Sequence, residues 1–295
     1  MLRSFAFYTA AVTLSLSGAV AGTLIPVPPV PGSTATYVLA INDSNVIAGS
    51  YVDSNGGEHA FFGALDGQYQ TFDVGKTGTE ARAIANDGTI AGIANTNGSV
   101  FTLVEFERLT DGTIKKIKKS GSQVLGVIGH FSNSSDKFVG DDADPNSGNI
   151  FGYIGVNGKY KSEVILSLDT QGQTRPRGLN GSGIITGFYG VDPNKHGFVL
   201  QKGVATEVDY PDSNAAGTQL GAINDNGVAV GAWNDNSGGS FPFTFDIASN
   251  TFTPFAVDGA SSISLWDINN QGLMAVNTDI GAFVYCPLKQ KKCPK

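Results

Sequence analysis

The residues with the clearest capacity for chemistry are three arginines, a histidine, a glutamate and a tryptophan. Guanidinium groups bind carboxylates and phosphates through forked hydrogen bonds, and an indole ring offers a flat surface for stacking. Such a set favours binding of an anionic small molecule or an acidic glycan. Its members are Glu80, Arg82, His130, Arg175, Arg177 and Trp266.

These residues are far apart in the sequence, but they occupy equivalent positions of a repeat. The repeat has the pattern Ile-Asn-Asp-x-Gly-x-φ-φ-Gly, where φ is apolar, and its first copy is residues 41–49. Further copies begin at residues 84, 132, 179, 223 and 268, so the period is about 45 residues. Four members of the set stand three residues before the Asn position of a copy, and two stand five residues before it.

The content of each copy predicts an all-β protein. Each repeat unit holds four short apolar segments separated by Asx and Gly turns, and no segment after residue 21 has helical periodicity. Four strands in about 45 residues are the content of a propeller blade. We therefore predict a six-bladed β-propeller formed by residues 22–288 as one domain. Inner strands would converge on its axis and bring the set together at one channel mouth, with Trp266 at the rim.

The last repeat unit is one strand short, which suggests how the ring closes. Residues 23–28 resemble the missing fourth strand, so we predict that they pair beside residues 281–288. Pro26 and Pro28 suit an outermost strand, where the missing N–H groups would face solvent.

The first repeat unit carries a longer pattern that resembles the extracellular HAF-repeat family. The matching residues are Ile41-Asn42-Asp43, Gly49-Ser50-Tyr51, His59-Ala60-Phe61 and Thr71-Phe72-Asp73-Val74. The resemblance covers nearly all of the chain after residue 21. Units one, four and five match well, whereas units two, three and six lack the His of the His-x-Phe step. It implies a secreted, propeller-like protein and supplies no catalytic residue. We expect His59 and His196 to form hydrogen bonds between blades, and Phe61, Phe198, Phe243 and Phe283 to be core.

Both termini indicate export. Residues 1–21 combine an early Arg3, an apolar stretch and a closing Ala19-Val20-Ala21, as in a cleaved signal peptide. Cys286 and Cys293 are the only cysteines, and in an oxidising compartment they would form a disulfide that ties the basic tail at 289–295 to the last strand.

A net charge of −7 argues against binding nucleic acid. We expect a monomer with no cofactor and no membrane span after cleavage.

Three other interpretations remain open. The arginines could pair with Glu80 and Asp267 and fill the channel structurally. The chain could be a lyase or hydrolase acting on an acidic glycan, with His130 or Glu80 as proton acceptor, or a purely structural cell-surface protein. A loop with Asp142, Asp144 and Asn146 at alternate positions loosely resembles a calcium loop but lacks a later acidic ligand.

Overall fold

A computed structural model describes residues 22–96, 103–117, 137–144, 146–212, 214–288 and 293–294, together with the backbone of two strands at Val12–Leu14 and Val127–Phe131. These residues form strands and turns, with no helix among them. Each repeat unit begins with a strand that ends just before the Asn position, and further strands follow it in antiparallel order.

The first unit has β3 (Ser33–Ile41), β4 (Ile47–Asp53), β5 (Glu58–Gly63) and β6 (Tyr69–Phe72). The second unit has β7 (Gly78–Ile84), β8 (Ile90–Asn95), β9 (Leu103–Arg108) and β10 (Ile114–Lys116). The third unit has β11 (Val127–Phe131), β12 (Lys137–Ala143), β13 (Ile150–Val156) and β14 (Lys159–Val164). The strands of the fourth and fifth units are β15 (Arg175–Leu179), β16 (Ile185–Val191), β17 (Asn194–Gln201), β18 (Val204–Val208); and β19 (Ala215–Ile223), β20 (Val228–Asp235), β21 (Ser240–Asp246), β22 (Thr251–Pro254). The last unit has β23 (Ile263–Ile268), β24 (Met274–Thr278) and β25 (Gly281–Pro287), and it is joined by β1 (Val12–Leu14) and β2 (Gly22–Pro26).

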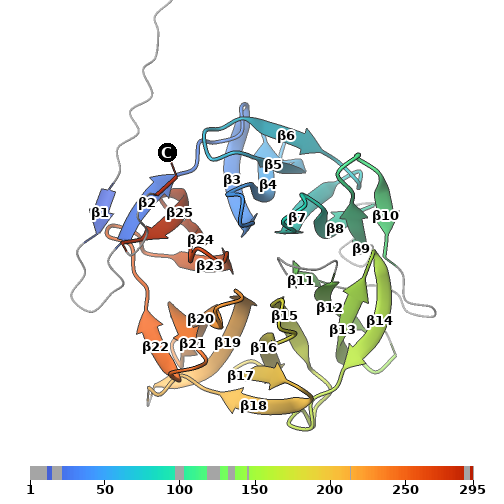
Figure 1. Ribbon diagram of the computed structural model, residues 1–295, viewed down its shortest axis with the longest axis vertical. Helices are drawn as coiled ribbons and strands as arrows, with labels where there is room; N and C mark the ends of the chain where they lie inside the picture. Colours follow the sequence, from blue (N-terminus) through green and yellow to red (C-terminus); the bar gives the residue numbers. More distant parts are fainter. Residues whose placement is uncertain are drawn as a thin grey trace, which may run out of the picture.

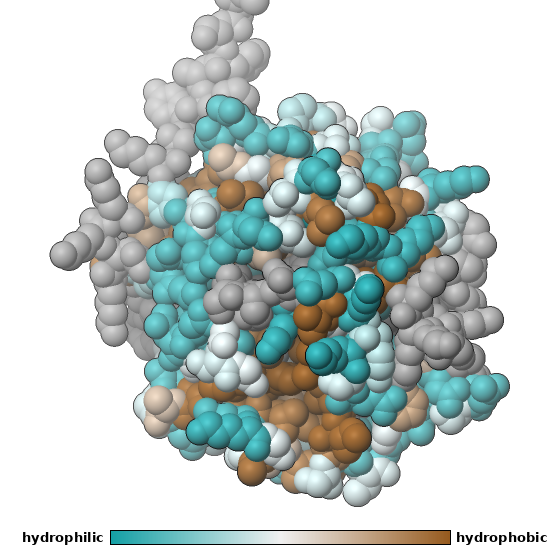
Figure 2. Space-filling view, turned by 45° about the vertical axis from the view of Figure 1, so that its right-hand side comes forward, coloured by the Kyte–Doolittle hydropathy of each residue, from teal (hydrophilic) through white to brown (hydrophobic). Residues whose placement is uncertain are grey.

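The sheets are arranged around a common centre, with the first strand of each unit innermost (Figure 1). The third, fourth and fifth units are separate four-stranded sheets. The first and second units are joined in one eight-stranded sheet by a single parallel pairing of Glu58 with Gly78. Inner strands from distant parts of the sequence therefore face the same central region. The face of the molecule seen in Figure 2 is largely hydrophilic, with hydrophobic residues gathered in a band from its centre to its lower part.

The N-terminal segment pairs with the last strand of the chain, as predicted from the missing strand. β2 is antiparallel to β25, with Gly22 opposite Pro287 and Pro26 opposite Phe283. The backbone N–H of Val27 extends this pairing by donating to the carbonyl of Ala282 at 2.9 Å. β1 pairs with the outer edge of β2 at residues 22–24, so β2 is not outermost over that stretch. The rest of the segment predicted as a signal peptide lies outside the described residues.

The core lies between neighbouring sheets. Phe61, Phe198 and Phe243 are fully buried, as expected from their place in the repeat, whereas Phe283 is only half-buried. One cluster joins the first unit to the last, because Val38, Ile47 and Phe61 pack with Leu273, Ala275 and Val284. Burial of apolar surface at about 25 cal/mol per Å² makes such contacts the main favourable contribution to folding.

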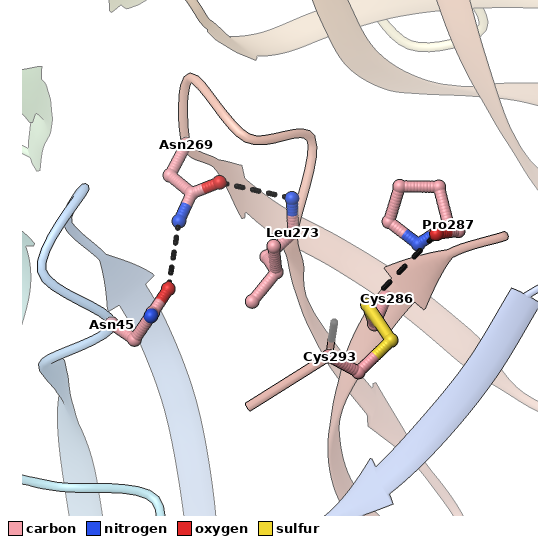
Figure 3. Close-up of a disulfide and its surroundings, with 6 residues drawn as sticks. All are labelled: Asn45, Asn269, Leu273, Cys286, Pro287 and Cys293. Atoms are coloured by element: carbon pink, nitrogen blue, oxygen red, sulfur yellow. Dashed lines mark hydrogen bonds between the residues drawn. A yellow bond between two sulfur atoms is a disulfide. The ribbon is translucent and has the colours of Figure 1, made fainter. Parts of the chain in front are cut away.

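The repeated asparagine organises its own turn. The Oδ1 atom of Asn269 accepts hydrogen bonds from the backbone N–H groups of Gln271 and Leu273, and Figure 3 shows the second of these. Asn42, Asn180 and Asn224 make the same pair of bonds to the residues two and four positions later. The turn glycines take positive φ, for example 78° at Gly227, which an L side chain rarely adopts. The predicted Asx turn is therefore present.

The same asparagine also connects adjacent units. Its Nδ2 group donates to a backbone carbonyl in the turn of the next unit: Asn42 to Ala85, Asn180 to Asn224, Asn224 to Asn269, and Asn269 to Asn42. These bonds are 3.0 to 3.2 Å long, and the four asparagines are buried. Asn133, the equivalent residue of the third unit, lies outside the described residues. A buried amide that satisfies two turns at once explains why this residue recurs.

The closing glycine of each motif makes room for the innermost strand. A Cβ atom at Gly49 would lie 1.9 Å from the carbonyl oxygen of Tyr37, and one at Gly92 would lie 1.9 Å from that of Glu80. Gly187 and Gly231 face the equivalent carbonyls at 2.2 and 2.6 Å. No side chain fits such a backbone approach without displacing the strand.

The chain ends with a disulfide between Cys286 and Cys293, whose Cα atoms are 5.9 Å apart (Figure 3). Cys286 is buried, and Cys293 packs against the cluster shared by the first and last units. Residues 289–292 and 295 lie outside the described residues. Across the part of the chain that the structure describes, no helix has the length and apolar character needed to cross a membrane.

Candidate functional site

A cavity of about 430 Å³ opens among the inner strands, and its lining comes from five of the repeat units. Its polar lining includes Arg82, Arg177, Gln219, Ser240 and Ser264. Its apolar lining includes Leu39, Phe188, Leu220, Ile263, Leu265 and Trp266. Three residues of the predicted set, namely Arg82, Arg177 and Trp266, therefore meet at one cavity although they come from three different units.

A β-bulge positions each of these three residues. The strand register shifts between Ala81 and Ala83, between Pro176 and Gly178, and between Leu265 and Asp267, so Arg82, Arg177 and Trp266 are the extra residues. The first unit has the same shift between Val38 and Ala40, which makes Leu39 its extra residue. A bulge bends the strand and turns the extra side chain away from the regular alternation. The position three residues before the repeat's Asn is thus directed by the fold, whatever side chain it carries.

Arg82 is held between a carboxylate and an indole. Its Nε donates to Oε2 of Glu80 at 2.9 Å, and its Nη2 lies 2.7 Å from the same oxygen. Its guanidinium carbon lies 5.7 Å from the ring centroid of Trp266, within the range of a cation–π contact. Burial and the nearby Glu80 raise the pKa of the Glu58 carboxyl, which accepts a hydrogen bond from Ser50 beside this pair. Trp266 remains 39% exposed, so its ring is accessible at the cavity.

Arg177 is paired with an acidic residue that the sequence did not indicate. Its Nη2 lies 2.8 Å from Oδ2 of Asp141, whose side chain is buried, and its Nη1 donates to the carbonyl of Pro176. Its guanidinium also lies 5.3 Å from the ring centroid of Phe188. The pairing fixes the orientation of the guanidinium, and Arg177 is one of the residues that line the cavity.

Arg175 lies beside this group but does not line the cavity. It donates to the carbonyls of Gln173 and Gly190 and to the side chain of Gln173, and its guanidinium lies 5.6 Å from the Phe188 centroid. Burial lowers the pKa of Arg175 from its ordinary value. Among the described residues it forms no ion pair with a carboxylate.

The two acids considered as partners of the arginines differ in their contacts. Glu80 pairs with Arg82, whereas Oδ2 of Asp267 accepts the backbone N–H of Ile41 at 2.8 Å and the Asp267 side chain is fully buried. Asp141, which was not considered, pairs with Arg177. The side chain of His130 lies outside the described residues, although a register shift in β11 places its backbone at the bulge of the third unit.

Asp141 and Phe188 were missed because they belong to the second strand of a unit. Each directly follows the closing glycine of its repeat, Gly140 or Gly187. Ala232, the equivalent residue of the fifth unit, also lines the cavity. In the last unit the equivalent Asn277 bonds both the N–H and the carbonyl of Val38. Variation at this position, which is Ser, Ile, Asp, Phe, Ala and Asn in the six units, is the signal that identifies it.

The loop that loosely resembles a calcium loop has its two aspartates in different environments. Asp144 caps its own turn, accepting the backbone N–H of Asn146 and the hydroxyl of Ser147. These bonds hold the pKa of Asp144 below its ordinary value. Asp142 is buried, and it lies close enough to Glu105 to raise the pKa of that carboxyl.

The repeated histidines bond within their own unit rather than between units, which corrects our expectation. His59 stacks on Tyr51 with ring centroids 5.1 Å apart, and its Nδ1 lies 2.9 Å from Asp73. His196 stacks on Tyr189 in the same way and lies 2.8 Å from Asp209. In the fifth unit Phe241 occupies the His position and stacks on Trp233, so this unit also lacks the His.

Comparison with solved structures identifies the architecture. TolB from Acinetobacter baumannii superposes with a TM-score of 0.57 at 14% identity, over 83% of this chain and 64% of that one. Aleuria aurantia lectin in complex with Fucα1-6GlcNAc superposes with a TM-score of 0.51 at 13% identity, over 89% and 99% of the two chains. The arrangement of β-sheets around one centre in this chain agrees with the folds of these two structures.

The fold is a β-propeller. Virginiamycin B lyase from Staphylococcus aureus is a further neighbour, with a TM-score of 0.50 and 12% identity over 86% of this chain and 95% of that one. The chain spans 64% of the length of the TolB chain. At these identities the likeness concerns the fold alone. No protein-family model and no curated protein matches the sequence.

Proposed function

We propose that this chain is an exported six-bladed propeller of the HAF-repeat kind that binds an acidic glycan, or a small anion resembling one, in the central cavity. The pairing of β2 with β25 and the bond from Asn269 to Asn42 support a ring closed between the first and last units. The predicted signal peptide and the disulfide at the C-terminus support export.

The observation that carries the binding function is the meeting of Trp266, Arg82 and Arg177 at one cavity. All three sit at bulges, where the backbone of a regular strand has been altered to direct a side chain. A packed structural plug would bury its aromatic ring, but Trp266 is 39% exposed beside a cavity of about 430 Å³. Mostly apolar linings with a few oriented polar groups are typical of small-molecule sites.

The lining favours a sugar over a bare inorganic anion. Trp266 offers a ring face on which the apolar face of a pyranose could stack, and Gln219 and Ser264 supply neutral hydrogen-bonding groups for hydroxyls. Because Arg82 and Arg177 already pair with carboxylates, they act as oriented donors more than as a surplus of positive charge. A carboxylate on the sugar would accept their remaining N–H groups. The ligand class is therefore a uronic-acid-containing oligosaccharide.

The test uses the protein beginning at Gly22 and compares uronate oligosaccharides with neutral oligosaccharides of the same length. We expect uronates to raise the melting temperature and to change the fluorescence of Trp266, whereas citrate, sulfate and phosphate have smaller effects. Trp266→Ala should weaken uronate binding at least about tenfold, corresponding to about 1.4 kcal/mol. Arg177→Lys keeps the charge beside Asp141 but loses the planar fork, so it should weaken uronate binding more than neutral binding.

The matched control is Trp233→Phe. Trp233 is the other tryptophan and is stacked between Tyr210 and Phe241, away from the cavity lining. This variant should bind as the parent does. If no uronate, citrate, sulfate or phosphate changes the melting temperature, the cavity is a structural feature and the proposed function is wrong. Equal binding of neutral and acidic sugars would retain the site but remove the anionic preference.

A further inference from the structure

We propose a divalent-metal site of the zinc type in the fourth repeat unit, formed by His196, Glu207 and Asp209. Each residue offers one ligand atom, and these atoms lie within 4.8 Å of one another. Nδ1 of His196 is 2.8 Å from Oδ2 of Asp209 and 3.9 Å from Oε2 of Glu207. One imidazole and two carboxylates form a mixed nitrogen and oxygen set that suits Zn²⁺, with water free to complete the coordination.

The strands hold these three side chains on one face of the sheet. His196 is in β17, Glu207 is in β18, and Asp209 directly follows the strand end at Val208. Two residues of one strand separated by one position point to the same side, so both carboxylates face the histidine across the pair of strands. The hydroxyl of Tyr189 donates to Glu207, and the Tyr189 ring stacks on the imidazole. These contacts orient two of the three ligands before any ion binds.

The first unit shows the same framework without the metal-binding geometry. There His59 stacks on Tyr51 and bonds to Asp73 through Nδ1, but Thr71 stands where the fourth unit has Glu207. A second carboxylate, Asp53, lies 3.5 Å from Nε2, on the opposite side of the ring. The two carboxylates of the first unit therefore lie on opposite sides of the imidazole and do not converge on one nitrogen. In the fourth unit Val191 stands at the position of Asp53, and the second acid, Glu207, lies on the same side of the imidazole as Asp209.

This difference indicates more than a repeated structural hydrogen bond. A histidine that only fixes the hairpin needs one carboxylate, which both units provide at similar distance. Glu207 adds a second negative charge on the same nitrogen side, and the two acids would repel each other unless a cation lies between them. His196, Glu207 and Asp209 are 39%, 48% and 40% exposed, so an ion could reach them from solvent. The site is separate from the central cavity, whose lining contains none of the three.

The experiment is calorimetric titration of Zn²⁺ into chelator-treated protein beginning at Gly22, with Co²⁺ as a spectroscopic probe. We expect one ion per chain, visible Co²⁺ absorption bands, and loss of affinity on acidification, because metal ligands must be deprotonated to bind. His196→Ala and Glu207→Thr, the second of which introduces the residue of the first unit, should each reduce the affinity for Zn²⁺ at least tenfold.

His59→Ala is the matched control and should bind Zn²⁺ as the parent does. All variants are compared by melting temperature to exclude unfolding. Absence of stoichiometric binding, or binding lost in the His59 variant but kept in the Glu207 variant, overturns the proposal.

Discussion

The side-chain amide of Asn269 donates to the backbone carbonyl of Asn42 at 3.0 Å, across 227 positions of the sequence. This bond joins the last repeat unit to the first in the same way that Asn224 joins the fifth unit to the last. Asn270 reinforces the junction, because its backbone N–H and its amide both donate to the Asp43 carboxylate at 2.8 Å. The repeated Asn-Asp step is therefore a connection between units as well as a turn.

Replacing Asn269 should destabilise the fold strongly. Asn269→Ala would leave the N–H group of Leu273 and the carbonyl of Asn42 without this partner in a buried place, and it would also remove the bond from the exposed Gln271. Because each unsatisfied buried group costs about 1–3 kcal/mol, we expect a loss of about 3 kcal/mol in the free energy of unfolding, measured in urea. Asn214→Ala, at an exposed turn, is the control. A loss below about 1 kcal/mol in the free energy of unfolding of the Asn269 variant would show that Asn269 is not essential to the junction between the two units.

Much of the architecture could be predicted from the sequence because it depends on period. The spacing of about 45 residues, the Asx turns and the short final unit each follow from local chemistry. The pairing of residues 22–26 with β25 followed from counting strands. Convergence of Arg82, Arg177 and Trp266 followed from their equivalent places in the repeat.

The partners within the site could not be predicted in this way. Asp141 reaches Arg177 from the neighbouring unit, and nothing in the repeat pattern specifies which side chains cross between units. The bulges at Arg82 and Trp266 are backbone irregularities that break the period-two alternation, so a regular-strand reading does not reveal them. Asp267 was considered as a partner of the arginines because of its place in the repeat, but its buried carboxylate accepts the Ile41 N–H.

Substitution at a closing glycine should act through the backbone. In Gly49→Ala the added Cβ would lie 1.9 Å from the Tyr37 carbonyl oxygen, so β3 and β4 would have to separate. We expect a loss of about 3 kcal/mol in the free energy of unfolding. Gly78→Ala is the matched strand control, because the nearest atom to its Cβ, a carboxylate oxygen of Glu58, is 3.7 Å away. Equal stability of the two variants would show that the strands adjust without cost.

Removal of the N-terminal strand should open the last sheet. A chain beginning at Gly32 lacks β2, which exposes the edge of β25 and removes Leu24, Val27 and Val30 from buried clusters. We expect a large fall in melting temperature and a tendency to aggregate, since an unpaired strand edge pairs with other chains. A chain beginning at Gly22 keeps β2 and lacks, among the described strands, only β1, so it should keep the stability of the longer chain. N-terminal sequencing of protein from the native host should also find a start at or near Gly22.

A buried acidic cluster lies between the second and third units. Glu105 is 2% exposed, and its Oε2 accepts the hydroxyl of Tyr153 at 2.5 Å, while its Oε1 has no hydrogen-bond partner among the residues that the structure describes. Burial raises the pKa of the Glu105 carboxyl to about 8, and the nearby Asp141 and Asp142 act in the same direction. Asp141 in turn forms an ion pair with Arg177. Glu105 is thus protonated in the folded protein at neutral pH.

Glu105 should make stability decrease as the pH rises. The folded state holds this proton up to a pKa of about 8, whereas in the unfolded chain the pKa is near its ordinary value of 4.5. Between these values the folded state binds more protons, so its stabilising contribution is complete below pH 4.5 and is lost progressively up to about pH 8. A pKa difference of one unit corresponds to about 1.4 kcal/mol, so the loss is on the order of a few kcal/mol.

Glu105→Gln cannot ionise and can still accept the Tyr153 hydroxyl, so its free energy of unfolding, measured in urea, should decrease less between pH 5 and pH 9. Glu163→Gln, on the exposed face of β14, is the control and should follow the parent. Parallel pH profiles for the parent and the Glu105 variant would show that this carboxyl is ionised in both states.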